Sequence, residues 1–288
     1  MKRLIFLFAL VLVGLVSCKK DEATTQPVVT AYDNANAVSG GILYDKFWAT
    51  EAAYDVSDAA KISHLNRYAD FYRCKQCHAW DLMGNTGSYI NRGAKTNRPN
   101  VAGSLIASKS KTPQQLFDAI KTGSATRRKI SDSIGVTTYN PTTNATVGDQ
   151  MPNYGTLLTD AQIWDLVKFI KEGAFDVTQL YDATYTGTYP TGKATFSNIG
   201  RDGNATTGKT FYETNCVTCH GVDGKSIPNL DGTAGMTAGK FVRTKPNEAQ
   251  HKVKFGQLGT AMKSIPSMTI TDVKNLYKAL ADTVAFPN

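Results

Sequence analysis

The feature that most constrains this chain is a five-residue pattern that occurs twice. Residues 74–78 (Cys-Lys-Gln-Cys-His) and 216–220 (Cys-Val-Thr-Cys-His) both follow Cys-x-x-Cys-His. These two motifs contain four of the five cysteines in the 288-residue chain. Two thiols one helical turn apart, followed at once by an imidazole, can hold a group by two covalent bonds and one metal–nitrogen bond. The fold must therefore build a site around each motif.

Three other uses of the cysteine pairs fit less well. A zinc site shared by both cysteine pairs would have to join pairs separated by 138 residues, far beyond the spacing of compact zinc modules. Structural disulfides or thioredoxin-like redox pairs would leave the repeated histidine unexplained, and no βαβ pattern surrounds either motif. Cys-x-x-Cys-His is the attachment signature of c-type haem. We therefore predict two haem c groups, with thioether bonds to Cys74, Cys77, Cys216 and Cys219 and with His78 and His220 as proximal iron ligands.

The N-terminal residues predict export. Lys2 and Arg3 precede an apolar run over residues 4–16, which has the length of a secretory signal core and is too short to span a bilayer. The run ends in Leu-Val-Ser-Cys18 and resembles a bacterial lipobox, in which the signal is cut before the cysteine and Cys18 is lipidated. A plain cleaved signal that ends near Cys18 is the alternative.

Export agrees with haem c attachment, which takes place outside the cytoplasmic membrane. We therefore expect a lipid-anchored protein of the cell envelope, on the outer membrane, at its periplasmic or its surface-exposed face. The expected partners are redox proteins of the envelope, and the membrane itself through the lipid. The formal net charge of +8 is spread along the chain without a dense basic tract, so we expect no nucleic-acid binding.

The same order of elements recurs around each motif. Gly208 and Tyr212 stand eight and four positions before Cys216. This stretch resembles the opening of class I cytochrome c domains, where the glycine lets the N- and C-terminal helices approach closely. Residues 66–74 lead into the first motif, but Asn66 takes the place of the glycine, so the helix crossing is less firmly predicted there.

An amphipathic helix closes each unit. Apolar residues recur at i, i+3, i+4 and i+7 in both, from Ile163 and from Val273. Thr159-Asp160 and Thr271-Asp272 are the expected helix starts, and a middle helix is expected over 112–121. Strand signals are weak. We predict an all-α fold of two cytochrome c-like helical domains in tandem, each around one covalently bound haem.

The expected boundaries follow from these elements. Residues 1–17 form the signal peptide, 18–43 a flexible tether, 44–175 the first domain, 176–203 a linker and 204–288 the second domain. A polar stretch over 124–149 is an insertion in the first domain.

The sixth iron ligand decides the function, because methionine favours electron transfer and a vacancy permits catalysis. Met151 precedes Pro152 on a loop twelve residues before Ile163, as the distal methionine does in the family that the chain resembles. Met262 is the corresponding candidate in the second unit. Three residues separate it from Pro266, so Met268 remains a rival, and His251 or a vacant site are further alternatives.

The resemblance covers roughly residues 60–174 and 204–283 and implies electron transfer, with each haem iron cycling between Fe(III) and Fe(II). The alternatives are a dihaem enzyme, such as a peroxidase-like oxidoreductase, and a haem-based sensor. Both require one labile or vacant iron site, and a fold alone does not decide between such functions.

Overall fold

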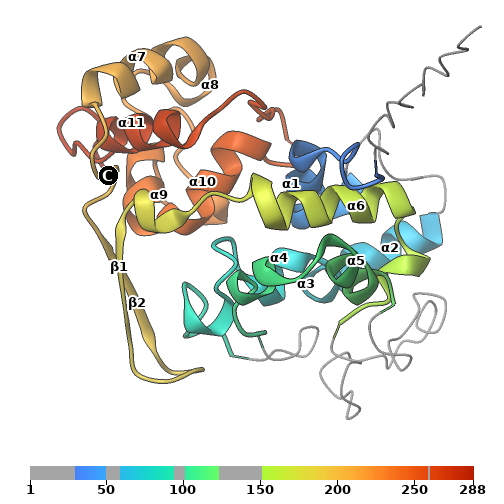
Figure 1. Ribbon diagram of the computed structural model, residues 1–288. Coiled ribbons are helices and arrows are strands. Elements are labelled where there is room, and N and C mark those ends of the chain that lie inside the picture. The colour runs from blue at the N-terminus through green and yellow to red at the C-terminus, as the bar shows by residue number, and fades with distance from the viewer. Residues whose placement is uncertain (1–29, 50–58, 94–100, 123–150, 259) are drawn as a thin grey trace, which may run out of the picture.

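The computed structural model describes residues 30–49, 59–93, 101–122, 151–258 and 260–288. The predicted signal, the lipidation candidate Cys18 and the whole of the expected insertion lie outside these residues. Helices dominate the described chain, which also contains one two-stranded sheet (Figure 1). The expected helical fold class is confirmed. No helix within the described ranges is long and apolar enough to cross a membrane.

The first unit contains six α-helices in the described residues: α1 (Ala37–Lys46), α2 (Ala59–Arg67), α3 (Ala69–Tyr72), α4 (Cys74–His78), α5 (Pro113–Lys121) and α6 (Asp160–Lys168). A single π-helical turn, Phe169–Gly173, extends α6. The expected middle and closing helices are both confirmed. Thr112 and Thr159 start them with capping boxes, in which the threonine hydroxyl and a glutamine side chain satisfy backbone N–H groups of the first turn.

The second unit contains α7 (Ala205–Asn215), α8 (Val217–His220), α9 (Ala238–Thr244), α10 (Pro246–Phe255) and α11 (Ile270–Leu280). The expected start of α11 at Thr271-Asp272 is wrong by two residues. Thr269 is the N-cap, because its hydroxyl accepts a hydrogen bond from the Asp272 N–H while the Asp272 carboxylate accepts one from the Thr269 N–H. Thr271 lies inside the first turn.

Part of the expected tether is helical. Residues 37–43 belong to α1, so the boundary placed between 43 and 44 cuts through a helix that packs on α6. A Cβ atom at Gly40 would lie 1.9 Å from the carbonyl oxygen of Asp165. A Cβ atom at Gly208 of α7 would lie 1.8 Å from the corresponding oxygen of Asn275 on α11. Both units therefore use a glycine to bring the first and last helices into backbone contact.

Helices lead into the first motif as expected, but the helix that crosses the closing helix is α1, further upstream in the chain. Gly40 precedes Tyr44 by four residues, just as Gly208 precedes Tyr212. The two units differ downstream, because Tyr44 stands 30 residues before Cys74 whereas Tyr212 stands four residues before Cys216. Helices α2 and α3 lie within this extra length of the first unit.

The connection between the units forms an antiparallel hairpin of β1 (Asp182–Thr186) and β2 (Lys193–Ser197). Its base packs on the second unit, where Phe196 meets the ring of Tyr181 edge-on. Its turn reaches the first unit, where the Tyr189 hydroxyl accepts a hydrogen bond from the Val101 N–H and donates one to the Arg92 carbonyl, both at 3.1 Å. The hairpin therefore contacts both units (Figure 1).

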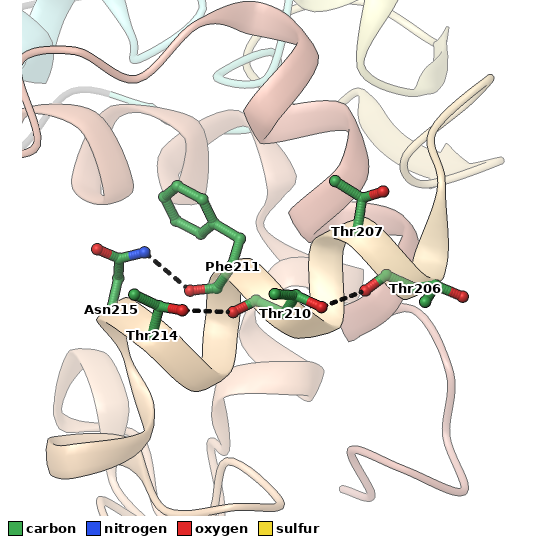
Figure 2. A pocket seen from close by; sticks show the side chains of 6 residues that line it. All are labelled: Thr206, Thr207, Thr210, Phe211, Thr214 and Asn215. Carbon is green, nitrogen blue, oxygen red and sulfur yellow. Dashed lines mark hydrogen bonds between the residues drawn. The ribbon is translucent and has the colours of Figure 1, made fainter.

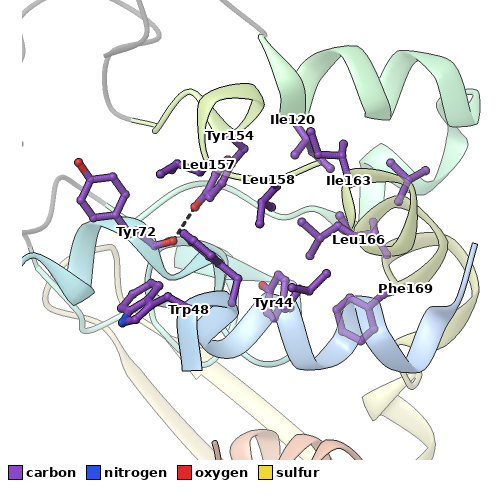
Figure 3. Packing of buried hydrophobic residues seen from close by; sticks show 14 of the residues in the cluster. Tyr44, Trp48, Tyr72, Ile120, Tyr154, Leu157, Leu158, Ile163, Leu166 and Phe169 are labelled. Atoms are coloured by element: carbon purple, nitrogen blue, oxygen red, sulfur yellow. Dashed lines mark hydrogen bonds between the residues drawn. The ribbon is translucent and has the colours of Figure 1, made fainter. Parts of the chain in front are cut away.

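Each unit has its own buried hydrophobic cluster. In the first unit, α1 and α6 face each other across Tyr44, Leu166 and Phe169 (Figure 3). Phe255 of α10 also belongs to this first cluster, although α10 is part of the second unit. A Cβ atom at Gly41 would lie 2.3 Å from the Phe255 ring, so a glycine again permits the close contact. The two units are packed against each other through α10.

Candidate functional site

The two Cys-x-x-Cys-His motifs lie on short helices that end in the same way. The residue after each histidine adopts a positive φ, 62° at Ala79 and 78° at Gly221. A left-handed conformation suits glycine and strains alanine. In each unit a tyrosine of the first helix donates a hydrogen bond to the carbonyl of this residue: Tyr44 to Ala79 at 2.6 Å and Tyr212 to Gly221 at 2.7 Å. The first helix therefore holds the backbone next to each candidate iron-binding histidine.

Removing these hydroxyl groups should weaken both units, the first more than the second. The Tyr44 hydrogen bond is fully buried, whereas the Tyr212 bond is partly accessible to water. Tyr44→Phe leaves the Ala79 carbonyl buried without a donor, which costs about 2 kcal/mol of unfolding free energy, and Tyr212→Phe should cost about 1 kcal/mol. Urea denaturation of the two variants measures both losses. Equal losses would contradict the difference in burial.

None of the four motif cysteines forms a disulfide bond. Burial raises the pKa of Cys74 and of Cys216 to about 11, and that of Cys77 to about 12. Reactive redox dithiols have a lowered thiol pKa instead. Within the described part of the chain, no group of three or more His, Cys, Asp or Glu side chains could hold a metal ion. Cys74, Cys77 and Cys216 therefore lack the lowered thiol pKa that a thioredoxin-like redox pair would have.

The donors that remain fit a covalently held haem. The buried Nδ1 atom of His220 has no hydrogen-bond partner, and burial lowers the pKa of this imidazole. A neutral imidazole is the form that binds a metal. Each motif thus places two cysteines outside any disulfide and one histidine within about one helical turn, with the hydrophobic cluster of its unit packed against the first cysteine.

The structure brings Met151 and the first motif to the same region. Met151 is half-buried and packs against the same cluster as Cys74. Three residues later, the Tyr154 hydroxyl donates to the Tyr72 carbonyl at 2.8 Å and lies 3.8 Å from the Cys74 sulfur. This contact ties the methionine loop to the segment that enters the motif. Met151 therefore remains the distal candidate for the first iron.

In the second unit the two candidate methionines differ in burial. Met268 is 2% exposed and lies inside the second hydrophobic cluster. Met262 is half-buried in a turn, where its carbonyl accepts a hydrogen bond from the Gln257 N–H at 3.0 Å. A distal ligand needs a sulfur that can face the iron, whereas Met268 is enclosed by protein atoms. The burial pattern favours Met262.

His251 does not lie where a ligand of the second iron would be expected. It is 1% exposed and packs between the units, with its ring centroid 4.7 Å from those of Trp80 and Phe255. Neither ring nitrogen makes a hydrogen bond of good geometry. Its aromatic neighbours also include Tyr44 and Phe169 of the first unit. The histidine therefore belongs to the contact between the units.

This burial predicts an acid-dependent loss of stability. Burial lowers the pKa of His251 to about 3, with Asp45 opposing the shift and Lys252 and Lys75 reinforcing it. Because the unfolded imidazole has a pKa of about 6.5, the unfolded state takes up the proton first as the pH falls. The contribution of His251 is complete above pH 6.5 and should fall by about 2 kcal/mol by pH 5. Urea denaturation of the parent and of His251→Leu at pH 7 and 5 measures this. An equal pH dependence in both would contradict it.

A buried charged cluster, which the sequence did not reveal, lies beside the first motif. Asp45 of α1 accepts hydrogen bonds from Arg73 and, at 2.7 Å, from Lys252 of α10. The ammonium groups of Lys75 and Lys252 lie 4.4 and 4.3 Å from the ring centroid of Trp80. In addition, the Gln250 side chain donates to the Trp80 carbonyl at 2.9 Å. These residues converge from helices far apart in the sequence, so no local pattern could predict the cluster.

A surface pocket on α7 plays no part in this site. Thr206, Thr207, Thr210, Phe211, Thr214 and Asn215 line it (Figure 2). The hydroxyl groups of Thr210 and Thr214 donate to carbonyls one turn earlier in α7, at 3.2 and 2.9 Å. Their polar groups are thus used within the helix, and no motif residue contributes to the lining.

Comparisons with known proteins agree with the motif analysis. The family model described as Cytochrome c matches residues 68–174 and 205–282, with one motif in each segment. The first segment begins after α1. A search of curated proteins finds no match. Among solved structures, a chain of the reducing HAO-like protein complex of Kuenenia stuttgartiensis is 14% identical, with 79% of this chain and 96% of that chain covered and a TM-score of 0.21.

Proposed function

Because this chain belongs to the cytochrome c family, we propose that it is a lipid-anchored dihaem cytochrome c that passes single electrons between redox proteins of the cell envelope. Members of this family carry covalently bound haem c, and the family suggests electron transfer. The observation that carries the proposal is the repeated unit. Each copy has two cysteines that form no disulfide, a histidine, and a tyrosine hydroxyl that donates a hydrogen bond to the carbonyl of the residue after that histidine.

The proposed roles follow the placement of the side chains. Cys74 and Cys77 hold the first haem, and Cys216 and Cys219 the second. His78 and His220 bind the irons on the proximal side, and Met151 and Met262 on the distal side. When bound, the haem supplies an iron that alternates between Fe(III) and Fe(II). The hydrophobic clusters exclude water and hold the ligands in place, which keeps the reorganisation on electron transfer small.

The anchor is the part of the proposal supported by the sequence alone. The apolar run over 4–16 and the lipobox-like residues before Cys18 support cleavage after residue 17 and lipidation of Cys18. Labelling of growing cells with a tagged fatty acid tests this. The parent protein should incorporate the label and Cys18→Ala should not. Label in the variant, or none in the parent, would overturn the anchor.

Two measurements test the core of the proposal: the number of covalently bound haem groups, and whether each iron keeps two protein ligands. Mass spectrometry of the purified protein should show two covalently added haem groups, and one or none would overturn the dihaem assignment. Carbon monoxide added to the reduced protein should leave the visible spectrum unchanged, because both irons keep two protein ligands. A change in about half of the haem absorbance would instead support the enzyme or sensor alternative.

A further inference from the structure

We propose that helix α10 fixes the placement of the two haem sites relative to each other, with Gln250, Lys252 and Phe255 as positioning residues. An electron then passes between the two irons without any movement of one unit against the other. This inference rests on the proposed dihaem function. It follows from the contacts that α10 makes on its two sides and at its C-terminal end.

One side of α10 belongs to the second unit. Helix α10 lies between α9 of its own unit and α1 of the first unit (Figure 1). Ala249 lies in the second hydrophobic cluster, and Val253 packs against that cluster. The Pro246 carbonyl accepts a hydrogen bond from the buried Tyr277 hydroxyl of α11 at 2.6 Å. These contacts hold α10 on the closing helix of its own unit.

The other side of α10 contacts the segments before and after the first motif. The Gln250 side chain donates to the Trp80 carbonyl at 2.9 Å, just after the motif. The Lys252 ammonium donates to Asp45 at 2.7 Å, and this carboxylate also accepts a hydrogen bond from Arg73, the residue before the motif. The side chains of Lys252 and Asp45 are 7% and 1% exposed, and a buried charge needs its partner. Lys252 therefore fixes the position of α10 on the first unit.

The C-terminal end of α10 holds the loop that carries the candidate distal ligand of the second iron. The Ile265 N–H donates to the Lys254 carbonyl at 2.8 Å, and the Gln257 N–H donates to the Met262 carbonyl at 3.0 Å. Lys254 follows Gln250 by four residues, which is about 6 Å along a helix axis. One short helix thus contacts the first motif and the distal loop of the second site at nearly the same level.

Two further contacts prevent α10 from shifting or rotating on the first unit. Phe255 lies in the first hydrophobic cluster, and the three atoms nearest to a Cβ atom added at Gly41 all belong to its ring, from 2.3 Å. The turn of the β1–β2 hairpin is a separate attachment, because the Tyr189 hydroxyl is hydrogen-bonded to Val101 and Arg92 of the first unit. The two units therefore form one rigid body.

A fixed placement suits electron exchange within one molecule. When one iron is Fe(II) and the other is Fe(III), one electron leaves the Fe(II) site, which becomes Fe(III), and the other site becomes Fe(II). No bond is made or broken, and no proton is required. The protein contributes the separation and orientation of the two groups, and α10 is the element that contacts both sites.

Pulsed electron paramagnetic resonance of the oxidised holoprotein tests the placement, because it measures the distribution of iron–iron distances. The parent protein should give one narrow distribution. Gly41→Val should broaden it and move it to longer distances, since the new side chain overlaps the Phe255 ring. Phe255→Ala in the same chain makes room and should restore a narrow distribution. Gly103→Val is the matched control, because no atom lies within 4 Å of a Cβ atom added there.

A second set of variants tests the ion pair without adding bulk. Lys252→Met removes the cation that joins the units but leaves Asp45 paired with Arg73, so no charge is left buried alone. It should broaden the distance distribution, whereas Lys252→Arg should keep it narrow. Lys245→Met is the matched control, because Lys245 pairs with Asp231 inside the second unit. If Gly41→Val does not fold, the parent protein and these variants still decide the question.

Exchange spectroscopy by nuclear magnetic resonance on the half-reduced holoprotein tests the consequence for electron transfer. The rate of electron exchange between the haems should be independent of protein concentration and should fall several-fold in Gly41→Val. A broad distribution in the parent, or an unchanged one in both Gly41→Val and Lys252→Met, would overturn the proposal. So would an exchange rate proportional to protein concentration. A purified protein with one haem or none would overturn the proposed function instead, so the two failures are distinguishable.

Discussion

Replacing Gly208 with valine is expected to destabilise the protein by at least about 3 kcal/mol. The first and last helices of the second unit touch at this residue, and a Cβ atom there would lie 1.8 Å from the carbonyl oxygen of Asn275. No rotamer change relieves the clash, because the obstacle is backbone. The α7 and α11 helices must move apart, and Tyr212 and Leu276, both buried between them, would lose packing.

Gly40→Val should cost a similar amount, since its Cβ atom would lie 1.9 Å from the carbonyl oxygen of Asp165. Gly103→Ala is the matched control, because no atom lies within 4 Å of the added Cβ. Urea denaturation followed by circular dichroism measures the three variants. A loss below about 1 kcal/mol at either crossing would show that the helices are not in the backbone contact described.

Separate replacement of Met262 and Met268 with alanine is expected to give opposite phenotypes. Met262→Ala should remove the distal ligand of the second iron, so that carbon monoxide binds there and alters about half of the reduced haem absorbance. The free energy of unfolding should change little. Met268→Ala should leave two protein ligands on each iron, so that carbon monoxide does not bind. It should destabilise the protein by about 2–5 kcal/mol, because a methionine that is 2% exposed fills space in the core.

The two measurements separate ligation from packing. Carbon monoxide binding in Met268→Ala and none in Met262→Ala would make Met268 the ligand and would contradict the assignment from burial. Met236→Ala serves as the control, because Met236 is also buried and its sulfur contacts the Thr244 hydroxyl at 3.8 Å. This control variant should lose stability without binding carbon monoxide at either iron.

The attachment motifs could be predicted from short stretches of the sequence. In this protein two cysteines and a histidine lie within five consecutive residues, so Cys74, Cys77 and His78 could be predicted as haem-binding candidates without a structure. The same is true of the closing helices, whose apolar period and capping threonine lie within a dozen residues. Local rules do have limits, since Thr269 and Thr271 are equally good caps in sequence and the hydrogen bonds with Asp272 select Thr269.

The first helix of the first unit could not be identified from the sequence, because it lies far from the motif in the chain. Gly40 and Tyr44 repeat the spacing of Gly208 and Tyr212, but Tyr44 stands 30 positions before Cys74, so the sequence did not reveal the match. Only the structure shows why residue 40 is a glycine: α1 contacts the backbone of α6 there, and α6 lies more than 120 residues later in the chain.

The sequence by itself predicted the attachment motifs and determined the closing helices and the helical fold class, because each depends on residues that are close together in the chain. Only the tertiary structure decided that α10 packs on the first unit, that Asp45, Arg73 and Lys252 meet in a buried cluster, and that His251 lies in this contact. The physical reason is that burial and charge pairing depend on which segments, distant in the chain, contact each other. Local sequence patterns do not predict those contacts.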